Sequence, residues 1–174
     1  MLNNQKNNMC TELASCAITE YLRSTPFDGP VVYRSDPDFP LYQYQYATTS
    51  QRSESMQPLA IIYAASESDV IRAMQCAAFV DTGIVVRTGG HSFSGMSSAG
   101  GTSIQLDMSG KRWPSSMKKS YPFKNFSFDA ANDLVTGGAA LSLHEFSEAL
   151  RVRGLFTVHG QCPTVHLGGH CQSG

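Results

Sequence analysis

The chain of 174 residues carries 13 basic and 14 acidic side chains, for a formal net charge of -1, and 41% of its residues are hydrophobic. This balance is that of a globular protein with apolar material for one domain-sized core, and it excludes a disordered chain. The charge provides no positive field for a nucleic-acid backbone, and no apolar run approaches the roughly 20 residues of a membrane-spanning helix, so we expect neither a nucleic-acid nor a membrane partner.

The first 55 residues are polar, and we expect residues 1–55 to form a loosely organised lead-in to a domain over residues 56–174. Four apolar residues within the lead-in predict a helix over residues 11–22; they are Leu13, Ala17, Ile18 and Tyr21. The domain opens with an apolar strand at residues 59–63. A helix should follow, because Ser66 is a suitable N-cap and the first turn after it is acidic.

That helix should end near Gly83, and residues 84–86 should form a second buried strand. Strand, helix and strand within about 30 residues constitute a βαβ unit, whose strands run parallel. A further strand at residues 104–106 should end at Asp107, and residues 111–128 should be a surface excursion.

A second unit of the same kind is predicted farther along the chain. Residues 134–136 have the composition of a strand, and Ser142 with Glu145 forms a capping box at the start of a helix that runs to Gly154. Residues 155–158 should be the closing strand. The sequence therefore predicts two βαβ-type units.

Two glycine-rich segments directly follow predicted strands: residues 87–95 (RTGGHSFSG) and residues 160–170 (GQCPTVHLGGH). Glycine lets the backbone approach a ligand closely, so that successive N–H groups converge on phosphate oxygens, as a pyrophosphate requires. The alternative is that the glycines only close α/β connections. Neither segment matches GxGxxG or GxxxxGK followed by Ser or Thr, so the sequence has neither a Rossmann fingerprint nor a P-loop.

Together the two segments resemble the berberine bridge enzyme-like branch of the p-cresol methylhydroxylase/vanillyl-alcohol oxidase flavoprotein superfamily, and the resemblance extends over residues 58–174. It implies a p-cresol methylhydroxylase-type FAD-binding domain of the α+β class, with two small subdomains around the flavin. It also implies that His91 is bonded to the flavin 8α-methyl carbon and Cys162 to ring carbon 6. The expected cofactor is therefore covalently held FAD.

Other residues of the two segments are implied to bind the cofactor without covalent bonds, through backbone or hydroxyl donors to the pyrophosphate. They are Thr88, Gly89, Gly90, Ser92 and Phe93 in the first segment and Gly168 and Gly169 in the second. Arg87 either pairs with a phosphate or stays solvated beside the strand end.

The two anchors are chemically sensible, because an imidazole and a thiolate are nucleophiles that can add to an electron-poor oxidised flavin. Each has a structural alternative, with His91 as a polar turn residue and Cys162 as a small buried apolar residue.

The second segment departs from the family pattern at His166, where the family has glycine, and at Cys171, where it has an aliphatic residue. These changes gather four potential zinc ligands in one short stretch, so a zinc-binding module is an alternative function; the ligands would be Cys162, His166, His170 and Cys171. Pro163 and the glycines favour a loop over a zinc site.

Plant-type relatives join an early cysteine to one in the helix before the first glycine segment, so the resemblance implies a disulfide between Cys16 and Cys76, with two unpaired thiols as the alternative. The bridge would require an oxidising compartment. Asn125 begins a glycosylation sequon, which also favours secretion, whereas the opening MLNNQKNNMC lacks the features of a signal peptide.

The resemblance implies an oxidoreductase in which hydride passes from an alcohol, sugar or alkaloid-like small molecule to flavin N5, and dioxygen or another acceptor reoxidises the flavin. In the family the catalytic base and a separate substrate domain lie beyond the second glycine segment. We therefore expect an N-terminal fragment whose FAD-binding domain is incomplete at the C-terminus and which lacks the substrate domain. The alternative is a degenerate, non-catalytic remnant that binds flavin.

Overall fold

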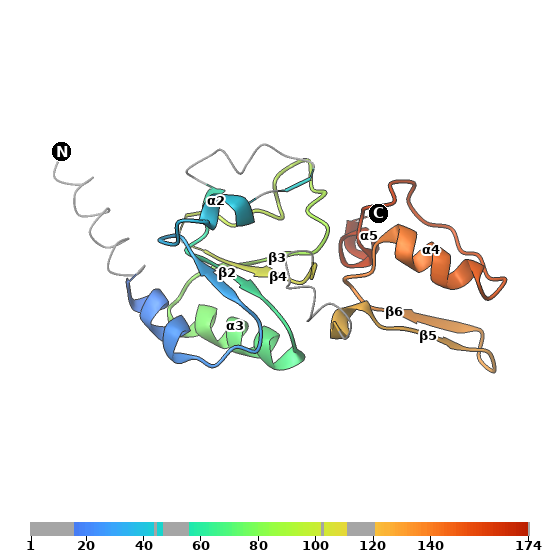
Figure 1. Ribbon diagram of the computed structural model, residues 1–174, viewed down its shortest axis with the longest axis horizontal. Coiled ribbons are helices and arrows are strands. Elements are labelled where there is room, and N and C mark those ends of the chain that lie inside the picture. Colours follow the sequence, from blue (N-terminus) through green and yellow to red (C-terminus); the bar gives the residue numbers. More distant parts are fainter. Residues whose placement is uncertain (1–15, 44, 47–55, 102, 111–120, 174) are drawn as a thin grey trace.

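The computed structural model describes residues 16–43, 45–46, 56–101, 103–110 and 121–173, which form two adjoining units (Figure 1). The first unit is a four-stranded sheet with helices on both faces, and the second is a two-stranded hairpin with two helices. The mixed α/β class is as predicted. None of the helices in these described ranges has both the length and the apolar character needed to cross a membrane.

The sheet of the first unit has the strand order β1-β2-β4-β3. Its strands are β1 (Val31–Tyr33), β2 (Ala60–Tyr63), β3 (Ile84–Arg87) and β4 (Ile104–Asp107). The strands β2, β4 and β3 run parallel, which confirms the first βαβ unit, although β4 inserts between the other two. Every residue of β2 and β4 is buried, as expected of parallel strands that are covered on both faces.

The edge strand β1 comes from the lead-in and pairs antiparallel with β2, with Val32 opposite Ile61. The prediction of a loosely organised lead-in is therefore wrong for the described residues before position 44. The sequence did not reveal this strand, because only its central residue is buried and three residues are too few to show a period.

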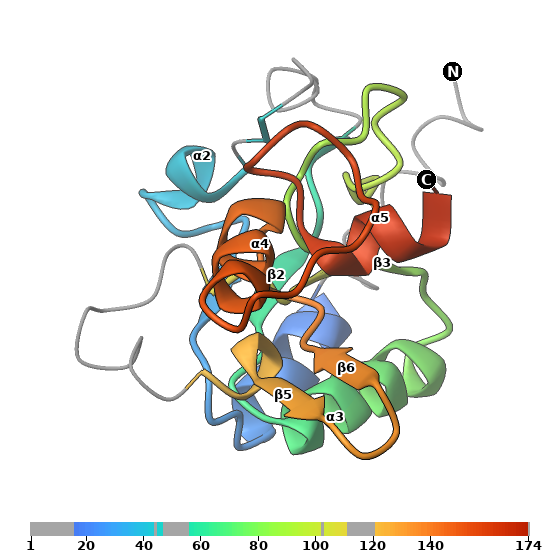
Figure 2. The ribbon, with the colours of Figure 1, turned by 90° about the vertical axis from the view of Figure 1, so that its right-hand side faces the viewer.

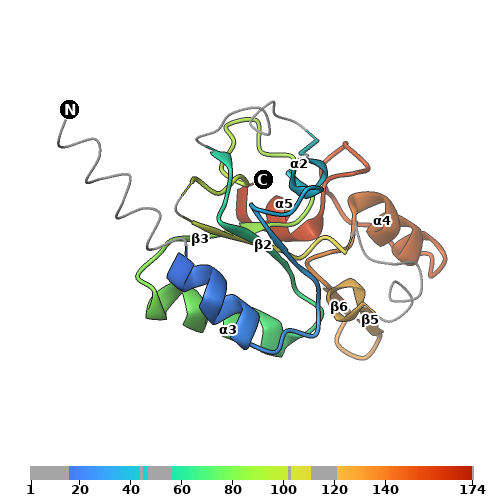
Figure 3. The same ribbon diagram turned by 60° about the vertical axis from the view of Figure 1, so that its left-hand side comes forward.

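Two helices lie side by side on one face of the sheet, one at residues 16–24 and the other α3 (Glu67–Phe79) (Figure 3). Ile18 and Leu22 of the first helix pack into the same core as Ala73 and Cys76 of α3. The helix predicted over residues 11–22 is confirmed from residue 16 onward, and residues 11–15 lie outside the described ranges. As predicted, α3 begins at an N-cap, where the Ser66 hydroxyl accepts a hydrogen bond from the N–H of Asp69.

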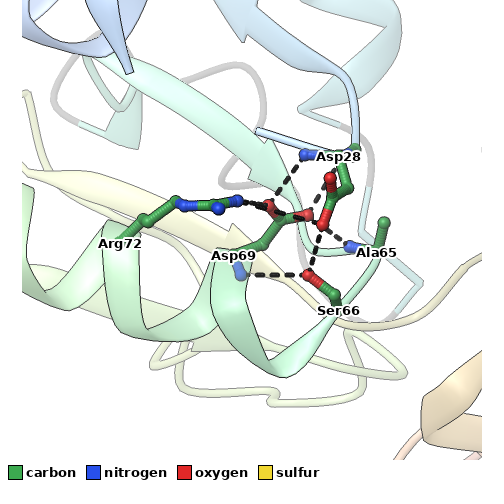
Figure 4. A network of polar contacts seen from close by, with 6 residues as sticks. Asp28, Ala65, Ser66, Asp69 and Arg72 are labelled. Atoms are coloured by element: carbon green, nitrogen blue, oxygen red, sulfur yellow. Dashed lines mark hydrogen bonds and ion pairs between the residues drawn. The ribbon is translucent and has the colours of Figure 1, made fainter. Parts of the chain in front are cut away.

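A buried carboxylate joins the chain before β1 to the start of α3 (Figure 4). The Asp69 side chain is fully buried and accepts three backbone hydrogen bonds, from the N–H groups of Asp28 at 2.9 Å, Gly29 at 3.0 Å and Ala65 at 2.8 Å. Arg72 lies 3.5 Å from the same carboxylate. Position 29 requires glycine, because a Cβ there would lie 1.8 Å from the carbonyl oxygen of Tyr63.

The short helix α2 (Phe39–Tyr42) covers the opposite face of the sheet, where Phe39 packs with Ile61 and Tyr63. Tyr121 and Ala140 of the second unit join this cluster. The two units therefore share apolar contacts.

The second unit begins with the 3-10 helix η4 (Pro122–Lys124) and a hairpin of β5 (Phe126–Asp129) and β6 (Leu134–Gly137), which pair antiparallel. This pairing corrects the prediction of a second βαβ unit. Residues 155–158 form no strand either, and Phe156 and Val158 are 86% and 89% exposed. Their apolar character has no partner strand to cover it within the described residues. The strand at residues 126–129 also corrects the end of the surface excursion predicted over residues 111–128. Residues 111–120 of that prediction lie outside the described ranges.

The capping box before α4 (Leu143–Arg151) is confirmed. The Ser142 hydroxyl accepts from the N–H of Glu145, and the Glu145 carboxylate accepts from the N–H of Ser142 at 2.9 Å. Leu143 packs with Leu167 of α5 (Leu167–Ser173) in the small core of this unit. The second unit thus rests on few buried side chains.

Cys16 and Cys76 are both free, so the disulfide that the resemblance implied is not formed in this structure. Cys76 is buried beneath the sheet, whereas Cys16 is exposed on its helix. Burial raises the pKa of the Cys76 thiol to about 11. Cys76 is therefore a protected core residue.

Candidate functional site

The two glycine-rich segments meet at the boundary between the units. Figure 2 views the molecule from the side of the second unit, and the connection from α4 to α5 is seen there beside the loop that follows β3. A Cβ on Gly89 would lie 3.1 Å from the backbone nitrogen of His166, and one on Gly168 would lie 2.8 Å from the methyl carbon of Thr88. Glycine at both positions therefore permits the close approach of the two segments.

This approach brings the two predicted anchors to one place. The hydroxyl oxygen of Thr164 lies 3.0 Å from Nε2 of His91 and 3.5 Å from Sγ of Cys162. Sequence reasoning missed Thr164, whose only signal is its place two residues after Cys162. The structure thus joins His91 and Cys162 through a third polar side chain.

The environment of Cys162 favours its thiolate. The hydrogen bond with the Thr164 hydroxyl, followed by that with the Thr164 backbone, lowers the pKa of the Cys162 thiol, although burial acts in the opposite direction. The side chain is partly exposed, so the alternative of a buried core cysteine is wrong. A thiol with a lowered pKa at the surface is chemically reactive.

His91 is held from the other side by the chain before β2. The Tyr46 ring stacks on the imidazole at a centroid distance of 4.2 Å, and the Tyr46 N–H donates to the carbonyl of Gly90 at 3.1 Å. Gly90 has a φ of +71°, a left-handed conformation that favours glycine. These contacts fix the loop around His91.

Arg87 behaves as neither alternative expected. Its guanidinium is buried, with Nε 2.6 Å from the Asp107 carboxylate and a terminal nitrogen donating to the carbonyl of Tyr42 at 2.9 Å. Asp107 also accepts from the N–H of Ser109 at 2.8 Å. The guanidinium thus ties the ends of β3 and β4 to α2, and it is neither solvated nor exposed to a phosphate.

The remaining predicted residues differ in how they face the boundary. Thr88 lies against Gly168, as its close approach shows, whereas the Phe93 ring is 86% exposed. The Ser92 hydroxyl accepts from the N–H of Met96 at 3.1 Å and so stabilises its own turn.

The N–H groups predicted to serve the pyrophosphate in the second segment are engaged within the chain. Gly168 donates to the carbonyl of Ala139 at 2.9 Å, and Gly169 donates to that of His166 at 3.2 Å. In this conformation, these two N–H groups are therefore not available to a pyrophosphate.

The zinc alternative is wrong. No group of three or more potential metal ligands occurs among the described residues, which include all four candidates. His166 is buried beside Gly89, His170 accepts from the N–H of Gly160 at 3.3 Å, and Cys171 is exposed on α5. Fewer than three of these four side chains therefore come together at any one point.

Known proteins are similar to this chain over most of its length. Residues 58–174 match the model of the family described as FAD binding domain. FAD-linked oxidoreductase ptmO of Penicillium ochrochloron is 25% identical over 144 residues, which cover 83% of this chain and 29% of the relative. Berberine bridge enzyme-like 19 of Arabidopsis thaliana is 32% identical over 127 residues, which cover 70% of this chain and 20% of the relative.

The structure of BBE-like 1 from Physcomitrella patens superimposes with a TM-score of 0.69 and 26% identity, covering 88% of this chain and 30% of that one. The chain thus spans between 20% and 30% of the length of these three relatives.

Proposed function

We propose that this chain holds FAD covalently through His91 and Cys162. The premise is that the chain belongs to the FAD-binding domain family and is related to berberine bridge enzyme-like FAD-linked oxidoreductases. The observation that carries the proposal is the meeting of these two nucleophiles at Thr164, although they lie in different units. A single planar ligand bound at the boundary between the units could contact both His91 and Cys162. The finer reaction is the oxidation of an alcohol, sugar or alkaloid-like small molecule, for which this domain would be one part of the enzyme.

Bound flavin would supply the hydride acceptor for the substrate. Tyr46 orients the His91 imidazole by stacking on it, and the Thr164 hydroxyl lowers the pKa of the Cys162 thiol through their hydrogen bond. Attachment to either residue would remove one hydrogen from that residue and one from the flavin, and dioxygen would be the acceptor of both, giving hydrogen peroxide. Gly89 and Gly168 allow the two segments that would hold the flavin to lie close together.

The test is retention of flavin through denaturation. The full chain is incubated with FAD and precipitated with acid, and the visible absorbance of the washed pellet is measured. Wild type should keep its flavin, His91→Ala and Cys162→Ala should each keep a singly bonded flavin with a shifted spectrum, and the double variant should lose it.

Cys171→Ala is the matched control, because Cys171 is an exposed thiol of the same unit and should be irrelevant to attachment. Complete release of flavin from the wild-type pellet would contradict covalent attachment. Binding that survives gel filtration but not acid would leave a noncovalent flavoprotein.

A further inference from the structure

Thr164 links a thiol to an imidazole, because its hydroxyl contacts both Sγ of Cys162 and Nε2 of His91. Its hydroxyl is on the surface, so substitution there removes little packing. The three groups come from two segments that meet only when both units are folded. A chain of thiol, hydroxyl and imidazole is an arrangement that can move a proton.

The proton count allows two complete states. In the first, the Cys162 thiol donates to the oxygen of Thr164, and the Thr164 hydroxyl donates to Nε2 of His91. In the second, one proton has moved along each step, so that His91 donates from Nε2 to Thr164, and Thr164 donates to the Cys162 thiolate. No hydrogen bond is lost between the states, and the second state is an ion pair of thiolate and imidazolium.

We propose that Thr164 relays the proton of Cys162 to His91 and thereby makes Cys162 the reactive thiol of this chain. The inference rests on the proposed function for its purpose, since a thiolate is the form of Cys162 that could bond to flavin. Its chemistry belongs to the chain itself and is open to measurement without flavin.

The surroundings of the relay agree with this role. The pKa of the Cys162 thiol is lowered, with the Thr164 hydroxyl as the largest cause. Two other titratable groups face His91, namely Tyr46, which stacks on its ring, and His166, which lies across Gly89. Cys171 is exposed in the same unit but outside the relay, so its alkylation is an internal comparison for that of Cys162.

The experiment measures alkylation by iodoacetamide, in which the thiolate displaces iodide. The full chain without flavin is treated between pH 5 and 9, and the modified peptides of Cys162 and Cys171 are quantified by mass spectrometry. The thiolate fraction rises about tenfold for each unit by which the pKa falls, whereas the nucleophilicity of the thiolate falls by a smaller factor. Cys162 should therefore react about three to ten times faster than Cys171 at pH 7.

Three variants separate the relay from a simple hydrogen bond. Thr164→Val should reduce the Cys162 rate to that of Cys171 and shift its pH profile upward, and Thr164→Ser should restore the rate. His91→Gln should have the same effect as Thr164→Val, because it removes the base while keeping a polar side chain. An unchanged rate in Thr164→Val or in His91→Gln would overturn the relay.

The two proposals fail independently. If wild-type Cys162 shows the fast, Thr164-dependent alkylation but flavin is released by acid, covalent attachment is wrong and the relay stands. If flavin is retained while Thr164→Val alkylates like wild type, the relay is wrong and attachment stands.

Discussion

The two units hold their glycine segments by different means. The first segment leaves a buried sheet at Arg87, which is fixed by the Asp107 carboxylate. The second segment leaves residues 155–160, which form no regular structure. It is held instead by small polar contacts, of which the Ser147 hydroxyl to Nε2 of His159 at 2.7 Å is one. The first glycine segment is therefore attached to the core of its unit, whereas the second is attached to α4.

A site between two units can therefore combine one segment that is fixed by a buried core with another that is held by fewer buried contacts. The cores differ accordingly, since whole strands of the first unit are buried, whereas residues of β6 alternate between exposed and half-buried. Disruption of the first unit should cost more stability than disruption of the second. Substitutions test this ordering.

The largest effect is expected from Asp107→Ala. It would leave the Arg87 guanidinium buried without its carboxylate, at a cost of about 3–5 kcal/mol in unfolding free energy. Urea denaturation followed by circular dichroism measures this loss. The double variant Arg87→Met, Asp107→Leu is the control and should recover most of it, because no buried charge remains. A single variant as stable as wild type would refute the core anchoring of the first segment.

Asp69→Ala should come next. Three backbone N–H groups would lose a buried charged acceptor, and we expect a loss of about 3 kcal/mol. Asp69→Asn should cost less, since one oxygen still accepts. The same urea titration applies, and limited proteolysis should show earlier cleavage before β1. Equal stability of the Ala and Asn variants would argue that the carboxylate itself is unimportant.

In the second unit, Ser142→Ala should cost about 1 kcal/mol through loss of the helix cap. Ser142→Thr is the control, because threonine also caps and keeps the hydroxyl that donates to the Glu145 carboxylate at 3.0 Å, and it should be nearly neutral. Thermal denaturation of α4 by circular dichroism is the measurement. A loss as large as that of Asp107→Ala would contradict the proposed difference between the units.

The partner of this cap gives a pH dependence. Burial favours the protonated form of Glu145, but hydrogen bonds from Lys124 and Ser142 outweigh it and hold the pKa of Glu145 below its ordinary value of 4.5. A depressed pKa in the folded state stabilises the fold above pH 4.5, and this contribution is lost as the pH falls through the folded-state value. The difference in unfolding free energy between wild type and Glu145→Gln should therefore shrink from pH 7 to pH 3, and a constant difference would contradict it.

A comparably small effect is expected at Gly154, after α4. Its φ of +69° is left-handed, and no atom lies within 4 Å of a Cβ placed there. Gly154→Ala should cost about 1 kcal/mol from backbone strain alone. Gly154→Asn should cost less, because asparagine adopts this conformation more readily. Equal destabilisation by both variants in thermal denaturation would indicate a side-chain clash instead.

The sequence was informative wherever a local signal decides the structure. Ser66 and Ser142 marked helix starts because a hydroxyl and the N–H groups of the next turn suffice for a cap. Apolar runs revealed β2 and β4, which are covered on both faces. The motif around His91 and Cys162 likewise indicated which residues would meet.

Pairing was less accessible. Residues 134–136 have strand composition, yet nothing local says that they turn back on β5 rather than join the parallel sheet. Phe156 and Val158 look like strand residues but are exposed. Arg87 was misjudged for a similar reason, because its partner Asp107 is brought to it only by the register of β3 and β4.

The Arg87 anchor also affects the entropy of binding. Ordering a flexible residue costs about 1–2 kcal/mol of backbone entropy, and a ligand that must order a loop pays this from its own contacts. Because Arg87 is held by Asp107 and Tyr42 within the folded chain, the first residues of the glycine segment start from a fixed direction before any ligand arrives. The first residues of this loop should therefore add little ordering cost to binding at the boundary.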